Sequence, residues 1–230
     1  MNILAIETSS PCLSVAAGRL GGRVFEMNFE AGLRHSENLM HAIQHVLKSA
    51  RLGKHDLDVI AYGRGPGSFT GLRIGLAAVK GLAAALQTKV IGVSSLDLIA
   101  LQLPEHETEI AVTLDARREA LYAAFYQYRA NKWQVVKKQA LVTYEAWCRE
   151  VKPQSVIAGD ALKSYGSRMK EDLPASVRWA PEKDWYPKAA AIFKWFQIFK
   201  RSIPYQSLED IKPYYLRLSE AEERRRLRRL

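Results

Sequence analysis

The sequence predicts an α/β protein with two lobes, each built on a mixed β-sheet, and three observations lead to this prediction. Apolar residues alternate along several short segments, which indicates strands, and recur every three to four residues along others, which indicates helices. The order strand, strand, strand, helix occurs twice along the chain. The first predicted strand of each series also ends in an acidic residue, Glu7 and then Asp115. These features together indicate an internal duplication.

The first half of the chain contains all the elements of one lobe. Strands are expected at residues 3–7, 13–17 and 24–29, joined by polar and glycine-containing turns as an antiparallel meander. A helix is expected from residue 36 to about residue 50, because Leu39, Ile43 and Val46 fall on one helical stripe. A strand at 58–62, a helix at 72–86, a strand at 90–93 and a helix at about 95–103 complete the lobe.

The second half repeats this order after a polar boundary segment at residues 104–108, which has no apolar period. The expected elements are strands at 111–115, 121–125 and 135–142, a helix near 144–151, a strand at 155–158 and a helix at 188–200. We therefore divide the chain into a first lobe at 1–103 and a second lobe at 104–210. Residues 211–230, a C-terminal segment with a basic tail, are expected to return to the first lobe.

Composition excludes several classes of protein. Apolar residues make up 48% and charged residues 25%, which is typical of an ordinary folded protein. Cys12 and Cys148 form no CxxC pair, so the chain encodes neither a disulfide framework nor a zinc knuckle. Because Glu7 interrupts the first apolar run and no uncharged run is long enough to span a bilayer, we expect a cytoplasmic protein with no membrane partner.

The positive charge lies in one half of the chain. Residues 1–110 carry ten Lys and Arg against ten Asp and Glu, whereas residues 111–230 carry the remaining 24 against 14. Arginines at five of the last seven positions form part of this excess. A charged surface in contact with solvent explains such an asymmetry, and contact with a nucleic-acid backbone is the functional alternative.

A glycine-rich loop before the helix at 72–86 is the most specific segment of the sequence. Its glycines allow a sharp turn, and Ser68 or Thr70 can cap a helix that begins near Gly71, leaving amide groups that suit an anion. The segment lacks the ending of a P-loop and the spacing of a nucleophile elbow, so a tight, well-capped turn is an equal alternative to phosphate binding. The candidate phosphate or nucleotide loop consists of Glu7, Thr8, Gly65, Gly67, Ser68, Thr70 and Gly71.

The helix after this loop carries small residues close to one face. An interior glycine costs a helix about 1 kcal/mol relative to alanine, so close approach of another backbone is the physical reason to keep Gly75 and Gly81. The partner is either the helix at 36–50 of the same chain or another chain. We therefore hypothesise a partner interface formed by Leu39, Ile43, Val46, Leu72, Gly75, Ala78, Val79 and Leu82.

The other reactive side chains point to weaker hypotheses. His41 and His45 have the HxxxH spacing of some metal sites, but they lie on the polar face of the helix beside Lys48 and are read as solvent-exposed histidines, so we predict no metal. Cys12 or Ser68 with His35 can be imagined as a nucleophile and its base. Nothing local activates either residue, and we therefore predict no catalytic residue.

Four segments carry a resemblance to a known family. They are ILAIETS at residues 3–9, HSENL at 35–39, GRGPGSFTGLRIG at 63–75 and IKPYYLR at 211–217. Together they resemble the bacterial TsaB family, also called YeaZ, over residues 1 to about 217. The resemblance implies the actin-like fold of the acetate kinase, Hsc70 and actin superfamily, which is related to RNase H.

The resemblance also implies a function and partners. It implies a non-catalytic scaffold in the synthesis of threonylcarbamoyladenosine, next to the anticodon of transfer RNA. The partners would be the catalytic paralogue TsaD and the ATPase TsaE, with a homodimer in isolation and transfer RNA contacted through the complex. A protease of the glycoprotease type and a stand-alone small ATPase or kinase are the alternatives.

The sequence departs from the catalytic paralogue in ways that support this expectation. The positions that align with the metal-binding histidines of TsaD are Ser95 and Ile99, and neither can serve as that ligand. After Asp115 come Ala116 and two arginines instead of the glycines of an actin-like phosphate hairpin. We therefore expect no cofactor, with at most part of a nucleotide site formed at a subunit interface.

Overall fold

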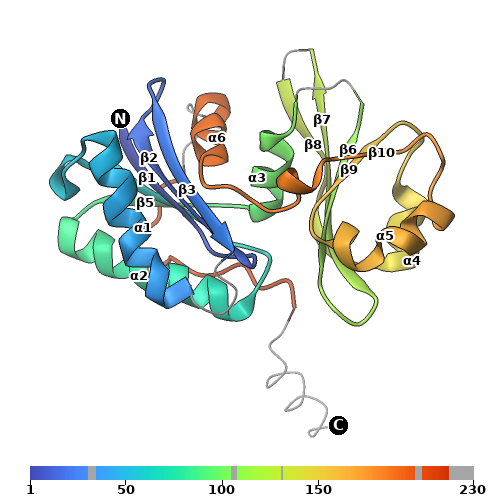
Figure 1. Cartoon of the computed structure of the whole chain (residues 1–230), viewed down its shortest axis with the longest axis horizontal. Helices are drawn as coiled ribbons and strands as arrows, with labels where there is room; N and C mark the ends of the chain where they lie inside the picture. Colours follow the sequence, from blue (N-terminus) through green and yellow to red (C-terminus); the bar gives the residue numbers. More distant parts are fainter. Residues whose placement is uncertain (31–34, 105–107, 131, 200–203, 218–230) are drawn as a thin grey trace, which may run out of the picture.

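The computed structural model describes residues 1–30, 35–104, 108–130, 132–199 and 204–217, and these residues form two lobes placed side by side (Figure 1). Each lobe contains one five-stranded sheet that combines parallel and antiparallel pairs. The predicted α/β class with mixed sheets is therefore confirmed. The arginine-rich tail at the C-terminus lies outside the described residues.

The first lobe opens with the predicted meander, in which β1 (Asn2–Glu7), β2 (Cys12–Arg19) and β3 (Val24–Glu30) pair antiparallel. Five elements follow: α1 (His35–Ala50), β4 (Val59–Gly63), α2 (Phe69–Leu86), β5 (Lys89–Val93) and α3 (Ser95–Gln102). Strands β4 and β5 add in parallel beside β1, which gives the order β3-β2-β1-β4-β5. Every element expected for this lobe is present.

The second lobe repeats the same plan. Its meander is β6 (Ile110–Asp115), β7 (Ala120–Arg129) and β8 (Lys132–Thr143), followed by α4 (Tyr144–Glu150), β9 (Val156–Ala158), α5 (Ala161–Asp172), β10 (Arg178–Trp179) and α6 (Ala191–Phe199). The sheet order β8-β7-β6-β9-β10 matches that of the first lobe strand for strand. This equivalence confirms the internal duplication.

Two elements of the second lobe were not predicted, α5 and β10. Helix α5 buries only Ala161, Leu162 and Met169, and it contains Gly166 among charged residues, so its apolar stripe is narrow. Strand β10 is two residues long. Neither element carries enough apolar residues to show a period in the sequence.

The last helix of each lobe packs against the sheet of the other lobe. Leu96, Ile99 and Leu103 of the α3 region pack on the inner face of the second sheet. Ile192 and Phe196 of α6 pack on the inner face of the first sheet. The outer faces are covered by α1 with α2 and by α4 with α5 (Figure 1). The chain therefore returns to the first lobe by residue 189, earlier than the expected boundary at 211.

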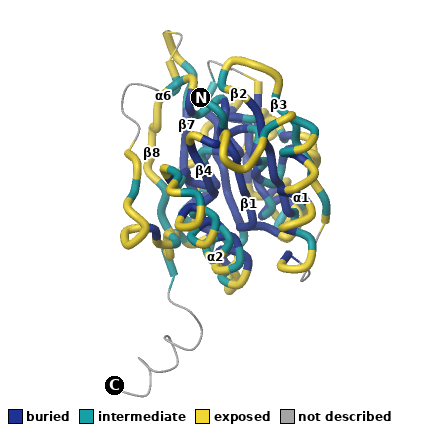
Figure 2. Tube along the Cα trace, turned by 90° about the vertical axis from the view of Figure 1, so that its left-hand side faces the viewer, coloured by how far each residue is buried: buried dark blue, intermediate teal, exposed yellow. Residues whose placement is uncertain are grey.

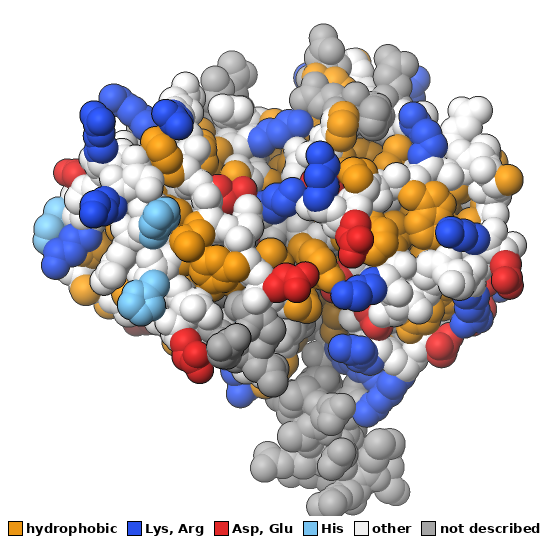
Figure 3. Space-filling view, viewed as in Figure 1, with side chains coloured by type: hydrophobic (Ala, Val, Ile, Leu, Met, Phe, Trp, Pro, Cys, Tyr) orange, Lys and Arg blue, Asp and Glu red, His pale blue; other side chains and the backbone are white. Residues whose placement is uncertain are grey.

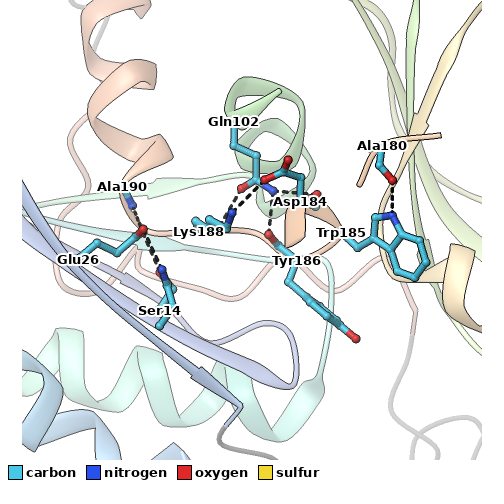
Figure 4. A network of polar contacts seen from close by, with 10 residues as sticks. Ser14, Glu26, Gln102, Ala180, Asp184, Trp185, Tyr186, Lys188 and Ala190 are labelled. Carbon is cyan, nitrogen blue, oxygen red and sulfur yellow. Dashed lines mark hydrogen bonds and ion pairs between the residues drawn. The ribbon is translucent and has the colours of Figure 1, made fainter. Parts of the chain in front are cut away.

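A polar network fixes the segment that carries the chain back to the first lobe (Figure 4). The Gln102 side-chain amide donates to the carbonyl oxygens of Asp184 and Tyr186, at 2.8 and 2.9 Å. Farther along, the backbone N–H of Ala190 donates to Glu26 at 2.7 Å. Because these partners lie in α3 and β3, the segment is held between the lobes before α6 begins.

Figure 2 shows how burial is distributed over this architecture. The central strand β1 is almost fully buried, whereas α1, α2 and β8 each expose one side or more. Among the described residues, α2 is long and apolar enough to span a bilayer by length and composition, yet only 28% of it is buried. An apolar helix of a folded lobe with so much exposure needs an explanation.

Candidate functional site: the glycine loop and the outer face of α2

The glycine-rich loop packs tightly against the turn between β1 and β2. A Cβ atom built at Gly71 would lie less than 3.0 Å from the backbone oxygen of Thr8, and one at Gly75 less than 3.0 Å from the Thr8 hydroxyl. A Cβ at Gly67 would likewise meet the backbone oxygen of Ser9 within 3.0 Å. The turn therefore fills the space that these glycines leave.

Backbone amides at the start of α2 are also used within the chain. The N–H of Ser68 donates to the carbonyl oxygen of Ser9 at 2.6 Å, and the N–H of Gly71 donates to the Ser68 hydroxyl at 3.2 Å. Ser68 is thus the N-cap, as expected, and α2 begins slightly earlier than predicted. The tight, capped turn explains the glycines without a ligand, and phosphate binding by this loop stays a prediction.

Glu7 lies in a closed cage at the end of β1. Its carboxylate has no exposed surface, and it accepts hydrogen bonds from the N–H of Ser9 at 2.5 Å and from the Ser95 hydroxyl at 2.9 Å. Burial raises the pKa of Glu7, and the hydrogen bonds from Ser9 and Ser95 oppose this shift only in part. Since a Cβ at Gly63 would collide with this carboxylate, the cage has no room for another group.

Ser95 and Ile99, the two positions at which the sequence lacks the expected metal-binding histidines, have structural roles. Ser95 holds Glu7, and Ile99 is fully buried in the cluster between α3 and the second sheet. Within the described part of the chain, no group of three or more His, Cys, Asp or Glu could hold a metal ion. His41 and His45 lie exposed on α1, and Figure 3 shows histidine side chains on the surface of the first lobe.

The imagined nucleophile and base are not arranged for catalysis. His35 is buried at the start of α1, and its Nε2 lies 3.0 Å from the carbonyl oxygen of Ser10. Burial, with further contributions from Glu30 and Glu26, raises the pKa of the Cys12 thiol, which lowers its thiolate fraction. Ser68 uses its hydroxyl to cap α2.

The equivalent corner of the second lobe has a different chemistry. The Oδ1 atom of Asp160 accepts a hydrogen bond from the N–H of Asp115 at 2.9 Å, and burial raises the pKa of Asp160 to about 6. The Arg117 N–H donates to the Asp115 carboxylate at 2.7 Å. Two neighbouring carboxylates, those of Asp115 and Asp160, therefore lie at this corner.

Most residues of the hypothesised partner interface lie in the core of the first lobe, so that part of the hypothesis is wrong. Leu39, Ile43, Val46, Leu72 and Val79 are buried against the outer face of the first sheet. The remaining members are the buried Gly75, which contacts Thr8, and the partly buried Ala78 and Leu82, which pack against the same cluster. These side chains hold α1 and α2 on their own sheet.

The exposed face of α2 is a second, parallel stripe of mostly small residues. It comprises Arg73, Ala77, Gly81, Ala84 and Ala85. A Cβ atom built at Gly81 would meet no described residue within 4 Å, so no contact with the described part of the chain requires a glycine there. We call these five residues of α2 the outer face.

The C-terminal segment at residues 204–217 contacts both lobes, and we call it the strap. Its return to the first lobe was expected, but its individual contacts were not. Gln206 pairs with Val90 at the edge of the first sheet, and Tyr215 stacks on Phe69 at the start of α2 with ring centroids 4.7 Å apart. The Arg217 guanidinium then donates to the carbonyl oxygen of Ala116 at 2.6 Å. The strap therefore joins the first turn of α2 to the β6–β7 turn of the second lobe.

Comparison with known proteins places this arrangement in a family. The model described as "TsaD: tRNA N6-adenosine threonylcarbamoyltransferase" matches residues 29–195. The chain is 37% identical over 134 residues to the tRNA threonylcarbamoyladenosine biosynthesis protein TsaB of Escherichia coli K12, an alignment that covers 57% of each chain. The protein of the same name from Bacillus subtilis 168 is 33% identical over 152 residues, 66% of each chain. These alignments span between about half and two thirds of the relatives' lengths.

Solved structures agree over a longer stretch. YeaZ from Pseudomonas aeruginosa superposes with a TM-score of 0.79 at 26% identity, covering 94% of this chain and 99% of that one. The match includes both lobes and so supports the duplicated architecture. With a family model that matches most of its length and with TsaB and YeaZ proteins as its relatives, the chain belongs to the TsaB (YeaZ) family and has an actin-like, RNase H-like fold.

Proposed function

We propose that this chain is a non-catalytic subunit that supports the transfer of a threonylcarbamoyl group to transfer RNA, docking a catalytic paralogue of the TsaD type. Its relatives are named for the biosynthesis of this modified nucleoside. The site geometry agrees with a non-catalytic role. Ser95 donates a hydrogen bond to Glu7, Ile99 is buried in the core, and the cage around Glu7 has no room for a ligand. The protein would then contribute a surface to the reaction, and the partner would contribute the reacting groups.

The observation that carries this proposal is the outer face. Ala77, Gly81 and Ala84 are exposed on one stripe of α2, and none of the described residues would come within 4 Å of a Cβ atom at Gly81. Small residues three to four apart allow another helix to approach closely, which is the packing expected of a docked partner. Arg73 and Lys80 on the same helix suit a protein partner better than a bilayer.

The direct test is a charged side chain on the outer face. Ala77→Arg places a good helix former at an exposed position, so the isolated chain is expected to fold as before. The variant is expected to lose co-purification with the TsaD-type paralogue and to abolish threonylcarbamoyladenosine in transfer RNA. Ser167→Arg, at an exposed position of α5, is the matched control and should change neither result. Normal complex formation by Ala77→Arg would rule out this docking surface.

Two further partners belong to the same proposal. In isolation the outer face would pair with a second copy of itself, so homodimer and heterodimer would compete for one surface. A TsaE-type ATPase would join the assembled pair, and transfer RNA would be contacted within the complex. Light scattering of the isolated chain, followed by titration with the paralogue, should show a dimer that is replaced by the heterodimer. A cytoplasmic location follows from this role.

The alternatives are less well supported. A protease would need an activated nucleophile or a metal, but Cys12 has a raised pKa and His35 faces a backbone carbonyl. A stand-alone ATPase would need a free phosphate loop, but the start of α2 already contacts Ser9. Stoichiometric ATP binding by the isolated chain in calorimetry would favour the ATPase over the scaffold.

A further inference from the structure

The β7–β8 hairpin carries charge of a single sign. Residues 120–143, which cover both strands, contain Arg129, Lys132, Lys137 and Lys138 and no Asp or Glu. All four basic side chains are exposed. Four of the 24 Lys and Arg of residues 111–230 therefore lie on one two-stranded ribbon that has no acidic residue. We call this hairpin the basic ribbon.

The position of the ribbon makes it accessible. Strand β8 is the edge of the second sheet, and Figure 2 shows that most of it is exposed. Lys132 and Lys138 are six residues apart, which corresponds to about 20 Å along an extended strand. A surface of that length can reach several phosphate groups of a nucleic acid.

The internal duplication provides a comparison within the same molecule. Strand β3 is the equivalent edge of the first sheet, but it carries Glu26 and Glu30. Glu26 is occupied, since it accepts hydrogen bonds from Ser14 and from the N–H of Ala190. The fold therefore does not require a basic edge, and the charge of β8 is specific to the second lobe.

Two partly buried aromatic rings lie near the turn of the ribbon, and one of them, Trp133, packs against the apolar cluster between α3 and the second sheet. Tyr128 and Trp133 pack edge to face with centroids 5.7 Å apart, and the Lys194 ammonium lies 5.3 Å from the Trp133 ring centroid. Basic residues interleaved with aromatic rings are typical of surfaces that bind RNA. The ion pair of Lys137 with Glu150 is exposed, so little free energy is needed to exchange it for a phosphate.

We propose that the basic ribbon contacts the phosphate backbone of the transfer RNA held by the assembled complex. This inference rests on the proposed function and adds a direct RNA contact by this chain. Lysines on an edge strand also prevent pairing with other strands. That role does not account for the absence of acidic residues across both strands. An acidic extended peptide paired to β8 is the competing occupant, and the experiment separates the two.

The experiment measures binding of an unmodified transfer RNA transcript to the complete complex at several salt concentrations. Each phosphate contact contributes about 0.7 to 0.9 to the slope of log affinity against log salt. The triple variant Lys132→Gln, Lys137→Gln, Lys138→Gln is expected to flatten this slope by about 2 and to weaken binding at low salt. The matched control, Lys163→Gln, Lys170→Gln, Lys183→Gln, removes the same charge from exposed positions elsewhere in the lobe and should leave the slope unchanged.

The outcomes distinguish this inference from the proposed function. An unchanged slope in a complex that still modifies transfer RNA would overturn the ribbon contact alone. Loss of the paralogue or of another protein from the triple variant, with the RNA slope intact, would identify β8 as a protein-docking edge and also overturn it. If the triple variant aggregates, the single variants Lys132→Gln and Lys138→Gln should each flatten the slope by less than one unit. Failure of the wild-type complex to modify RNA would instead contradict the proposed function.

Discussion

The same substitution at two glycines of α2 should change stability in opposite directions. At Gly81 a methyl group meets nothing within 4 Å, so Gly81→Ala gains helix propensity, about 1 kcal/mol, without a new contact. At Gly71 the methyl group would lie inside 3.0 Å of the backbone oxygen of Thr8, which cannot rotate away. Overpacking of this kind costs about 1 to 3 kcal/mol.

Thermal and denaturant unfolding of the isolated chain would measure both effects. For a chain of this size, 1 kcal/mol corresponds to about 2–4 °C in Tm, so Gly81→Ala should raise Tm by about that amount and Gly71→Ala should lower it. The measurements need a series of protein concentrations, because a homodimer through the outer face would link stability to association. A decrease in stability for Gly81→Ala at every concentration would refute the assignment of Gly81 to an open surface.

Two other predictions concern the corner of the second lobe. The pKa of Asp160 is raised to about 6 in the folded chain, so its contribution to stability is complete below about 4 and is lost as pH rises through 6. Wild type should therefore lose unfolding free energy relative to Asp160→Asn between pH 4 and pH 7, and parallel pH profiles would contradict this. Arg217→Ala removes donors to the carbonyl oxygens of Ala116 and Arg117. It should speed amide hydrogen exchange in the β6–β7 turn while β1 stays protected, and unchanged exchange there would show that the strap does not hold the lobes together.

Most of the fold could be predicted because alternation and helical spacing are strong where a face is buried. Strands β1, β2 and β3 alternate or run apolar, and Ser68 marks the start of α2. Helix α5 escaped prediction because its polar surface outweighs a three-residue buried stripe. The packing of α3 and α6 against the sheet of the opposite lobe could not be predicted, because the apolar face of a helix does not indicate which sheet it packs against.

The candidate site was predicted only in part. The glycine loop and the capping serine were recognised, but no pattern in the sequence indicated that Thr8 and Ser9 fill the space beside the glycines. The interface hypothesis selected the apolar stripe of α2, and that stripe faces the core, as the apolar face of a surface helix usually does. Ala77 and Gly81, which are small and exposed on the opposite side of α2, are the residues on which our docking proposal rests instead.

The exchanged helices have a consequence for the way the protein is made. Strand β1 is synthesised long before Ile192 and Phe196, the side chains that cover the inner face of its sheet. A nascent chain that stops after the first 150 residues therefore displays an uncovered apolar sheet. Such a surface is a site for chaperone binding or aggregation until α6 arrives. The inner face of the first sheet is therefore covered only after α6 has been synthesised.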